Sequence, residues 1–339
     1  MKLIKLAIAS VVALLISDLG MASAADKSVK VFILAGQSNM EGHGKVEYGR
    51  NPEYKKGVKG VRREIKGGLY CLRSLATDPE TSATYKHLLD AEGKWVEHDN
   101  VLISTTTGGK KTGKLSVGFG AGNWFGPELG FGHVVGDAIK EPVLIIKTAW
   151  GGHSLGIKFR PPSAGQPNYM KKAKEEEVGS SYRKMIEIVN DITGDLGKHF
   201  PELKGYKAEI AGFGWHQGYN DGCSEEMTAE YEKNMALFIK DVRKDLGVKN
   251  LPFVIANTGM GGVQWTKGKF LTLCQAQMAI GDPQKHPEFK GTVTSVDTIP
   301  FKDLEEREIS KFGYHWNHSA ESHYKVGDAM GKAMVTLLK

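Results

Sequence analysis

Ser38 stands where an apolar run ends, and its hydroxyl could act as a nucleophile. The run reads Phe-Ile-Leu-Ala-Gly-Gln-Ser-Asn-Met over residues 32–40. This order predicts a strand, then a small residue, then a serine at the exposed strand end, where a helix can begin. Amide groups at such a helix start can stabilise a developing oxyanion. A serine that only caps a helix gives the same pattern, so this segment alone leaves both interpretations open.

Two further apolar runs end in groups that could donate hydrogen bonds to an oxyanion. Residues 143–149 lead into Gly151 and Gly152, and glycines let backbone N–H groups approach a substrate closely. Residues 211–219 lead into Asn220, whose side-chain amide is a donor of the kind found in oxyanion holes. A tight turn and an Asx turn are the structural alternatives for the two segments.

His315 lies just before the last helical stretch, where a histidine could serve as a general base. Alone, such a histidine is more often structural. Together, however, the four segments supply a nucleophile, an oxyanion glycine, an oxyanion asparagine and a base in chain order. Acyl transfer requires this set of groups.

Alternating strands and helices must position these groups. Apolar, β-branched runs and helical spacing predict strands at 29–34, 143–146, 209–213, 253–256 and 292–296, and helices at 130–139, 182–196, 227–246 and 322–338. This alternation predicts an α/β fold with a parallel sheet covered on both faces.

Residues 42–122 interrupt the alternation. The segment is rich in Gly and Lys and is too long for a plain connection. We interpret it as an insertion packed over the carboxyl end of the sheet, where α/β proteins keep their ligand sites. A disordered linker is the alternative, but Tyr70, Leu72, Tyr85, Leu88 and Trp95 give the segment apolar surface to bury.

The N-terminus has the form of a secretory signal. Lys2 and Lys5 precede an apolar run over 6–16, and Ala-Ser-Ala at 22–24 suits signal peptidase. The run is shorter than the roughly 20 residues of a membrane span, although a retained anchor is the alternative. We therefore expect a signal peptide at 1–24, a single domain at 25–339, a secreted or periplasmic location, and no membrane insertion after signal removal.

The composition is that of a globular protein, with 40% hydrophobic and 25% charged residues. The formal charge of +6 is not gathered in a basic block, so we expect no nucleic-acid partner. The three cysteines lack metal-type spacing, and the sequence cannot pair them.

Three motifs resemble the sialate O-acetylesterase domain family, carbohydrate acetylesterases of the SGNH superfamily. They are Gly-Gln-Ser-Asn-Met at 36–40, Ala-Trp-Gly-Gly at 149–152 and Trp-His-Gln-Gly-Tyr-Asn-Asp at 215–221. The resemblance spans about 30–339. It implies a flavodoxin-like, three-layer α/β/α sandwich, an acetylated carbohydrate as substrate, and neither metal nor organic cofactor.

Carried over by position, the resemblance makes Ser38 the nucleophile and His315 the base. The oxyanion donors would be the Ser38 N–H, a glycine of the Gly151–Gly152 pair and Asn220. The superfamily usually has an Asp three residues before the histidine, and Phe312 occupies that position here. The orienting acid is then expected from the acidic run at 303–308, with Glu306 as the candidate.

Substrate contacts are expected from four residues near the motifs: Gln37, Trp150, Gln217 and Arg160. A tryptophan face suits the apolar C–H face of a sugar, although a core role is an equal alternative for the motif tryptophans. Arg160, with Lys147 and Lys158, could meet a carboxylate or sulfate on an acidic sugar.

Two other functions fit parts of the sequence. A metal hydrolase could use His315, His318 and His323, but their spacing matches no common zinc motif. A catalytically silent carbohydrate-binding protein would explain the missing Asp before His315. We prefer the esterase because it accounts for all four segments.

Overall fold

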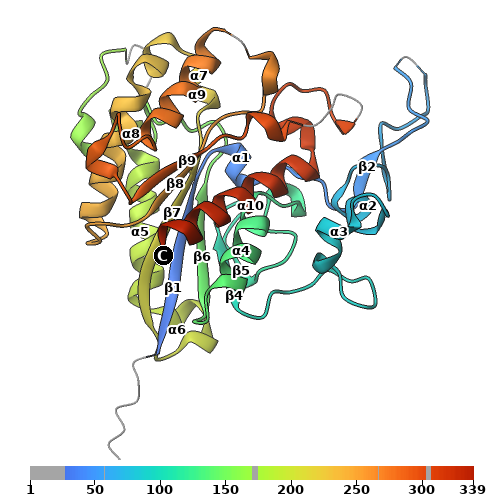
Figure 1. The fold of residues 1–339 in the computed structure, drawn as a ribbon, viewed down its shortest axis with the longest axis horizontal. Helices are drawn as coiled ribbons and strands as arrows, with labels where there is room; N and C mark the ends of the chain where they lie inside the picture. The colour runs from blue at the N-terminus through green and yellow to red at the C-terminus, as the bar shows by residue number, and fades with distance from the viewer. Residues whose placement is uncertain (1–26, 57, 170–174, 266, 303–306) are drawn as a thin grey trace, which may run out of the picture.

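A seven-stranded sheet runs through the centre of the protein (Figure 1). The computed structural model describes residues 27–56, 58–169, 175–265, 267–302 and 307–339. Neighbouring strands are parallel except for one antiparallel pair at an edge of the sheet. In sheet order the strands are β5 (Lys111–Lys114), β4 (Val101–Thr105), β6 (Val143–Ala149), β1 (Ser28–Gly36), β7 (Lys207–His216), β8 (Phe253–Ala256) and β9 (Val293–Val296).

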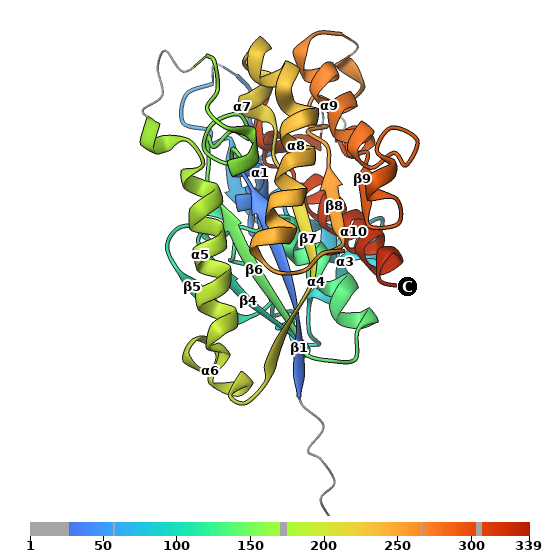
Figure 2. The same cartoon turned by 90° about the vertical axis from the view of Figure 1, so that its left-hand side faces the viewer.

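Helices cover both faces of this sheet. One face carries α4 (Pro127–Ala138) and α10 (Ala320–Leu337), and the other carries α5 (Ser180–Gly194), α8 (Glu225–Asp245) and α9 (Lys269–Ile280) (Figure 2). Side chains of β1 alternate between the two cores. Val31 and Ile33 pack with α5 and α8, whereas Phe32 and Leu34 pack with α4 and α10. The predicted three-layer α/β/α sandwich is confirmed.

Local sequence explains why these elements form. All residues of β6 and β8 are buried, and near-continuous apolar runs are typical of parallel strands covered on both faces. In α8, the Ser224 side chain accepts a hydrogen bond from the Met227 N–H and caps the first turn. Acidic residues in the first turn of α8 and basic residues in its last turn interact favourably with the helix dipole.

All five predicted strands and all four predicted helices are present. Helix α9 was not predicted because a polar side chain interrupts its apolar face. Gln277 is fully buried there, and its amide group bonds the Gln217 carbonyl and the Thr258 N–H. A buried polar residue of this kind weakens the apolar periodicity by which a helix is recognised in the sequence, although its hydrogen bonds are satisfied in the fold.

The predicted insertion at 42–122 needs two corrections. Its end is part of the main sheet, because β4 pairs with β6 and β5 pairs with β4. The rest forms a small subdomain with β2 (Tyr48–Arg50), β3 (Glu64–Lys66), α2 (Leu72–Thr77) and α3 (Ser82–Tyr85). It packs against the first turns of α4 and α10 through a third apolar cluster, so it lies beside the sheet rather than over its end (Figure 1).

Short helices connect the main elements. They are α1 (Ser38–Glu41), α6 (Leu196–His199), α7 (Tyr219–Gly222), and the 3₁₀ helices η1 (Lys86–Leu88), η2 (Ala121–Asn123), η3 (Pro162–Ala164), η4 (Glu175–Glu177), η5 (Pro201–Leu203), η6 (Gly262–Gln264), η7 (Pro287–Phe289), η8 (Ile299–Phe301) and η10 (His315–His318). Within the described ranges, no helix is both long and apolar enough to span a bilayer. The predicted signal peptide at 1–24 lies outside the described residues.

Candidate active site

The motifs meet where β6, β1 and β7 end. In the sheet register, Gly36 of β1 pairs with Ala149 of β6 and with His216 of β7, so the three strands end at one level. The chain leaves β1 toward one side of the sheet and later returns to β7 on the other side, which makes this edge a topological switch point. Ser38 follows β1 directly, and Asn220 follows β7.

A pocket of about 370 Å³ lies at this edge. It is lined by Gln37, Ser38, Glu41, His43, Gly151, Gly152, Tyr219, Asn220, Met260, Tyr314 and His315. The structure thus brings together six of the residues predicted for the site. A larger hollow of about 740 Å³, beside α3, α4 and α10, contains none of the four motifs, so we assign the site to the smaller pocket.

Ser38 is the first residue of α1, so its backbone N–H has no acceptor within the helix. The residue is only 9% exposed, and its side chain faces the pocket rather than a capping partner. In the described part of the chain, the Ser38 hydroxyl makes no hydrogen bond, which leaves it free to react.

Gln37 orients the asparagine of the site. Its Oε1 accepts from Gln217 Nε2 at 3.0 Å, from the Gly218 N–H at 3.1 Å and from the Asn220 N–H at 3.3 Å. Its Nε2 donates to Asn220 Oδ1 at 3.0 Å. Because the amide oxygen of Asn220 is engaged, Asn220 Nδ2 is left as a donor, and it lies 4.0 Å from where a Cβ of Gly152 would be.

The two glycines differ in what their N–H groups do. The Gly151 N–H bonds the Glu41 carboxylate, and a Cβ at Gly151 would lie 3.1 Å from Glu41 Oε2. Gly152 has a left-handed φ of 75°, which favours glycine, and its N–H makes no hydrogen bond within the described residues. Of the predicted pair, Gly152 is therefore the one with a donor available to substrate.

A buried carboxylate ties the turn after β6 to α7. Asp221 is fully buried and accepts from the Leu155 N–H at 3.0 Å, the Gly156 N–H at 2.8 Å and Gln217 Nε2 at 2.6 Å. Burial raises the pKa of Asp221 to about 6, so the group is ionised at neutral pH. Its hydrogen bonds hold the glycine turn and Asn220 in register.

His315 is presented by a left-handed turn. Residues 315–318 have φ values of 54°, 50°, 48° and 64°, a conformation that is strained for residues with side chains and is typically kept at functional sites. Asn317 stabilises the turn, because its carbonyl accepts from the Ser310 N–H and its Oδ1 accepts from the Gly313 N–H, both at 2.8 Å. The neighbouring Trp316 is buried in the core beneath.

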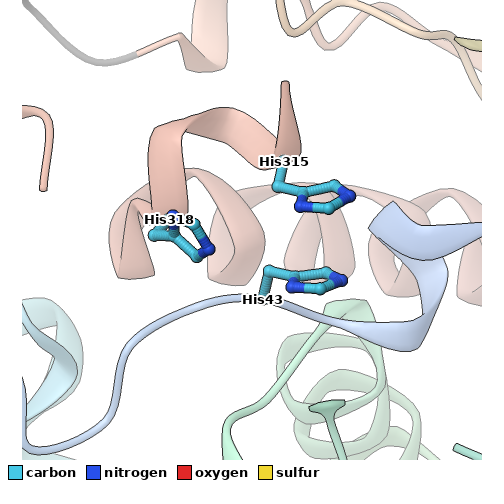
Figure 3. Close-up of side chains that lie close together, drawn as sticks. All are labelled: His43, His315 and His318. Atoms are coloured by element: carbon cyan, nitrogen blue, oxygen red, sulfur yellow. The ribbon is translucent and has the colours of Figure 1, made fainter. Parts of the chain in front are cut away.

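The His315 ring is neutral at physiological pH. Burial lowers the pKa of His315 to about 4, so the ring is able to accept a proton. It stacks on the ring of His43, with centroids 3.8 Å apart and planes 8° apart (Figure 3). No carboxylate within the described ranges bonds His315.

The predicted acid partner is not placed by the structure. Glu306 lies outside the described residues. Glu308, from the same acidic run, is described and pairs with Lys302. Phe312, where the superfamily usually has Asp, is half exposed and packs edge-on against His318. The role of Glu306 therefore stays a prediction.

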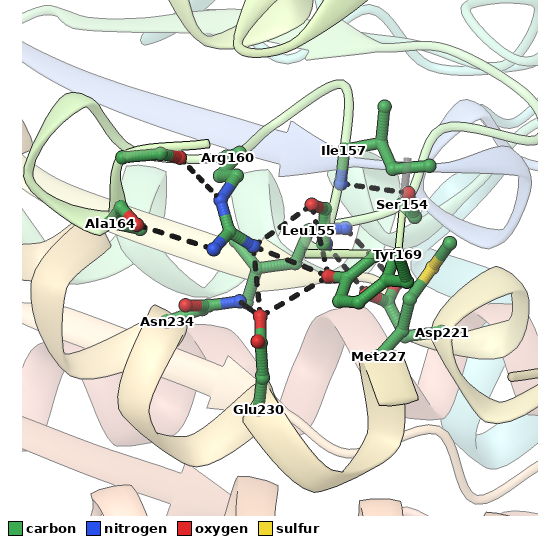
Figure 4. A network of polar contacts seen from close by, with 12 residues as sticks. Ser154, Leu155, Ile157, Arg160, Ala164, Tyr169, Asp221, Met227, Glu230 and Asn234 are labelled. Atoms are coloured by element: carbon green, nitrogen blue, oxygen red, sulfur yellow. Dashed lines mark hydrogen bonds and ion pairs between the residues drawn. The ribbon is translucent and has the colours of Figure 1, made fainter. Parts of the chain in front are cut away.

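Arg160 is not at the pocket, contrary to the predicted substrate contact. It is 5% exposed, and its guanidinium pairs with Glu230 at 2.9 Å and donates to three backbone carbonyls and to Tyr169 (Figure 4). Lys147 is also unavailable, because it is fully buried and paired with Glu128 at 2.8 Å. Lys158 lies 4.0 Å from Glu177 and is not part of the pocket lining.

Trp150 and Gln217 take supporting positions instead of lining the pocket. The Trp150 ring packs against His153 and Phe159, on the core of the α5 and α8 face. Gln217 is 1% exposed and holds Gln37 and Asp221. Of the four predicted substrate contacts, Gln37 alone reaches the lining.

Five lining residues were not identified from the sequence: Glu41, His43, Tyr219, Met260 and Tyr314. Glu41 and His43 follow the serine motif directly, and Tyr219 and Tyr314 adjoin Asn220 and His315. Their proximity to the motifs was the available signal. For Met260 the sequence offered no such signal. Met260 lies in the loop after β8, which contains none of the motifs and reaches the site only in the folded chain.

Comparisons with known proteins show the family of the chain. Residues 28–336 match the family model described as "carbohydrate esterase, sialic acid-specific acetylesterase". Among curated proteins, none matches the chain.

Two solved structures share the fold. A protein from Arabidopsis thaliana has 18% identity and a TM-score of 0.52, with 91% of this chain and 98% of that chain covered. A carbohydrate acetylesterase from Xanthomonas citri has 16% identity and a TM-score of 0.51, with 90% of this chain and 55% of that chain covered.

Proposed function

Because the chain belongs to the carbohydrate esterase family of sialic acid-specific acetylesterases, and is therefore a carboxylic ester hydrolase, we propose that it removes O-acetyl groups from a glycan through a Ser38–His315 acyl-enzyme mechanism. The observation that supports the mechanism is the convergence of Ser38, His315, Gly152 and Asn220 in one pocket. These residues come from four segments that only the fold brings together.

The proposed reaction begins when His315 takes the Ser38 proton and the Ser38 oxygen attacks the acetyl carbonyl. The oxyanion accepts hydrogen bonds from the Ser38 N–H, the Gly152 N–H and Asn220 Nδ2. The bond to the sugar oxygen breaks, and His315 returns its proton to that oxygen. Water activated by His315 then hydrolyses the acetyl-enzyme and releases acetate.

Glu306 is the proposed acid partner of His315. Its neighbour Glu308 is engaged by Lys302, so the other acidic residues of the run are better candidates to orient the imidazole. Glu306→Gln should lower kcat strongly, whereas Asp303→Asn and Glu305→Gln should have little effect. If another of these variants gives the large loss, the acid partner is that residue.

The pocket favours a neutral acetylated sugar over a sialate. Its described lining includes the Glu41 carboxylate and no Lys or Arg. Lys147 and Arg160, which the sequence suggested could meet an acidic sugar, are instead paired with Glu128 and Glu230. Tyr219 and Tyr314 offer aromatic faces at the lining. Acetylated xylo-oligosaccharides should give a higher kcat/KM than O-acetylated sialic acid. The reverse order would refute this substrate class while leaving the mechanism intact.

Hydrolysis of p-nitrophenyl acetate tests the mechanism. Ser38→Ala and His315→Ala should reduce turnover to background, whereas Ser82→Ala, at a serine of the subdomain, should leave it unchanged. EDTA should not lower the turnover of wild type. If turnover survives Ser38→Ala, the nucleophile is misassigned. If the wild type binds acetylated glycans without turnover, the carbohydrate-binding alternative replaces the esterase.

We also propose that the protein is exported. The basic start, the short apolar run and the Ala-Ser-Ala triplet support this location. N-terminal sequencing of protein recovered outside the cytoplasm should give Ala25 as the first residue. An intact N-terminus at Met1 on exported protein would indicate a retained anchor.

A further inference from the structure

Three histidine side chains lie close together (Figure 3), and two of them, His43 and His315, line the pocket. His43 follows α1, and His315 and His318 belong to η10, so the group joins segments far apart in the sequence. One ring nitrogen from each histidine lies within 4.8 Å of the others. The trio considered from spacing included His323, but the structure groups His43 with His315 and His318.

These side chains have the chemistry of transition-metal ligands. Burial lowers the pKa of His43 and of His318 to about 3 and that of His315 to about 4, so each ring is neutral at neutral pH and offers a lone pair. Neutral imidazole is a preferred ligand of Zn²⁺, Cu²⁺ and Ni²⁺. Three histidines that leave a fourth position open form a well-known type of zinc site.

Two further contacts support a metal site. His318 Nδ1 lies 2.9 Å from Ser310 Oγ, and such a hydrogen bond fixes the ring and leaves Nε2 as the ligand atom. His43 Nε2 is buried and has no hydrogen-bond partner in the described part of the chain. A buried polar atom without a partner is costly, and a bound cation would satisfy it.

We propose that His43, His315 and His318 bind a divalent transition-metal ion, with Zn²⁺ as the best match, and that the bound ion inhibits the esterase. The ion occupies the lone pair with which His315 would accept the Ser38 proton. Binding of the metal stands on the cluster alone, whereas inhibition rests on the proposed role of His315.

The ring geometry makes metal binding and catalysis mutually exclusive. Tetrahedral Zn²⁺ with Zn–N bonds of about 2.0–2.1 Å holds its ligand nitrogens about 3.4 Å apart. The three ring nitrogens here lie within 4.8 Å of one another. An ion in the plane of one stacked ring cannot also lie in the plane of the parallel ring. His43 or His315 must therefore rotate, which breaks the stack that orients His315 in the free enzyme.

Three described cations, Lys45, Lys147 and Arg63, act on the histidines of the cluster, and two of them are paired with carboxylates. Lys45 lies over the Trp124 ring beside the cluster, but its ammonium pairs with Glu64 at 3.1 Å. Glu41 lines the same pocket and contributes a negative charge when ionised. Lys147, which acts on His43, pairs with Glu128, and Arg63 acts on His318, so the three rings bind the ion in the presence of these positive charges.

Co²⁺ absorption is the direct test, because tetrahedral Co²⁺ has intense visible bands that aqueous Co²⁺ lacks. The purified protein, carrying no histidine tag and stripped with EDTA, should bind one Co²⁺ with such bands, and Zn²⁺ should displace it. His43→Phe keeps an aromatic ring on His315 but removes a ligand. His43→Phe and His318→Gln should each weaken binding by at least the ~10–100-fold that loss of a mere second-shell partner costs.

His286→Gln is the matched control, because His286 contacts Glu232 and Glu288 and is not part of the cluster. It should bind Co²⁺ like wild type. Absence of tetrahedral Co²⁺ in wild type, or equal binding by His43→Phe, would overturn the metal site whether or not the protein is an esterase.

Inhibition is measured separately. Zn²⁺ should inhibit p-nitrophenyl acetate hydrolysis at the concentrations that displace Co²⁺, and EDTA should restore the rate. Zn²⁺ binding without inhibition would show that His315 is not the base and would leave the metal site standing. A rate that rises with Zn²⁺ would instead support metal-dependent hydrolysis.

Discussion

Asn220 is a hydrogen-bond donor whose direction is set by two neighbouring glutamine side chains. Gln37 holds the amide oxygen of Asn220, and Gln217 holds Gln37. The network is buried, so its hydrogen bonds are well protected from competition by water. It places one donor group, Asn220 Nδ2, toward the turn that carries Gly152.

Asn220→Ala should lower kcat by ~10²–10³ with a smaller effect on KM, because the lost donor acts on charge that develops in the transition state. Steady-state kinetics on p-nitrophenyl acetate measure the effect. The control is Asn190→Ala, at an exposed asparagine of α5. A loss expressed only in KM would place Asn220 in ground-state binding.

The pH–rate profile should reflect the buried environment of His315. The base works only when neutral, and burial lowers its pKa to about 4. Activity should therefore persist as pH falls, and kcat/KM should halve near pH 4, instead of near the ~6.5 of an unperturbed histidine. Brief pH-jump assays measure this before the protein unfolds. A midpoint near 6.5 would contradict the assigned environment.

At the scale of elements, a buried ion pair joins β6, α4 and the end of α1. Lys147 of β6 pairs with Glu128 of α4, and both side chains are fully buried. Lys147 Nζ also donates to the Glu41 carbonyl at 2.9 Å and to the Phe119 carbonyl at 2.7 Å. The pair thus fixes the end of the helix that begins with Ser38.

Glu128→Ala should destabilise the protein by about 3–5 kcal/mol, because it leaves a buried ammonium without its partner. Urea unfolding gives the free energy. Glu209→Ala, which breaks an exposed pair with Lys30, should cost under about 1 kcal/mol. Replacing both partners, as Glu128→Leu with Lys147→Met, should recover most of the loss. A cost equal to that of Glu209→Ala would mean the buried pair is not formed.

For the whole molecule, several histidines are buried in neutral form on different elements. Burial lowers the pKa of His133 and His43 to about 3 and that of His216 to about 4. In the unfolded chain these rings take up protons below about pH 6.5. Because the unfolded state then binds more protons, stability is complete above that pH and falls as pH decreases. Asp221 and Glu41, whose pKa values burial raises, act in the opposite direction but are fewer than the buried histidines.

The free energy of unfolding should therefore decrease between about pH 7 and pH 5. His133→Leu, outside the pocket, should reduce this pH dependence because it removes one titrating ring. Urea unfolding at each pH is the measurement. A free energy that does not change over this range, or a variant with an unchanged slope, would contradict the assignment of neutral buried histidines.

The sequence determined the layers of the fold and which motifs share one edge of the sheet. Apolar periodicity identified the strands, and the carboxyl ends of neighbouring parallel strands meet at one edge, so Ser38, Gly152 and Asn220 were expected together. Tertiary structure alone decided that Arg160 and Trp150 face other partners and that His43 joins His315. Those positions depend on packing between segments distant in the chain, which local spacing does not encode.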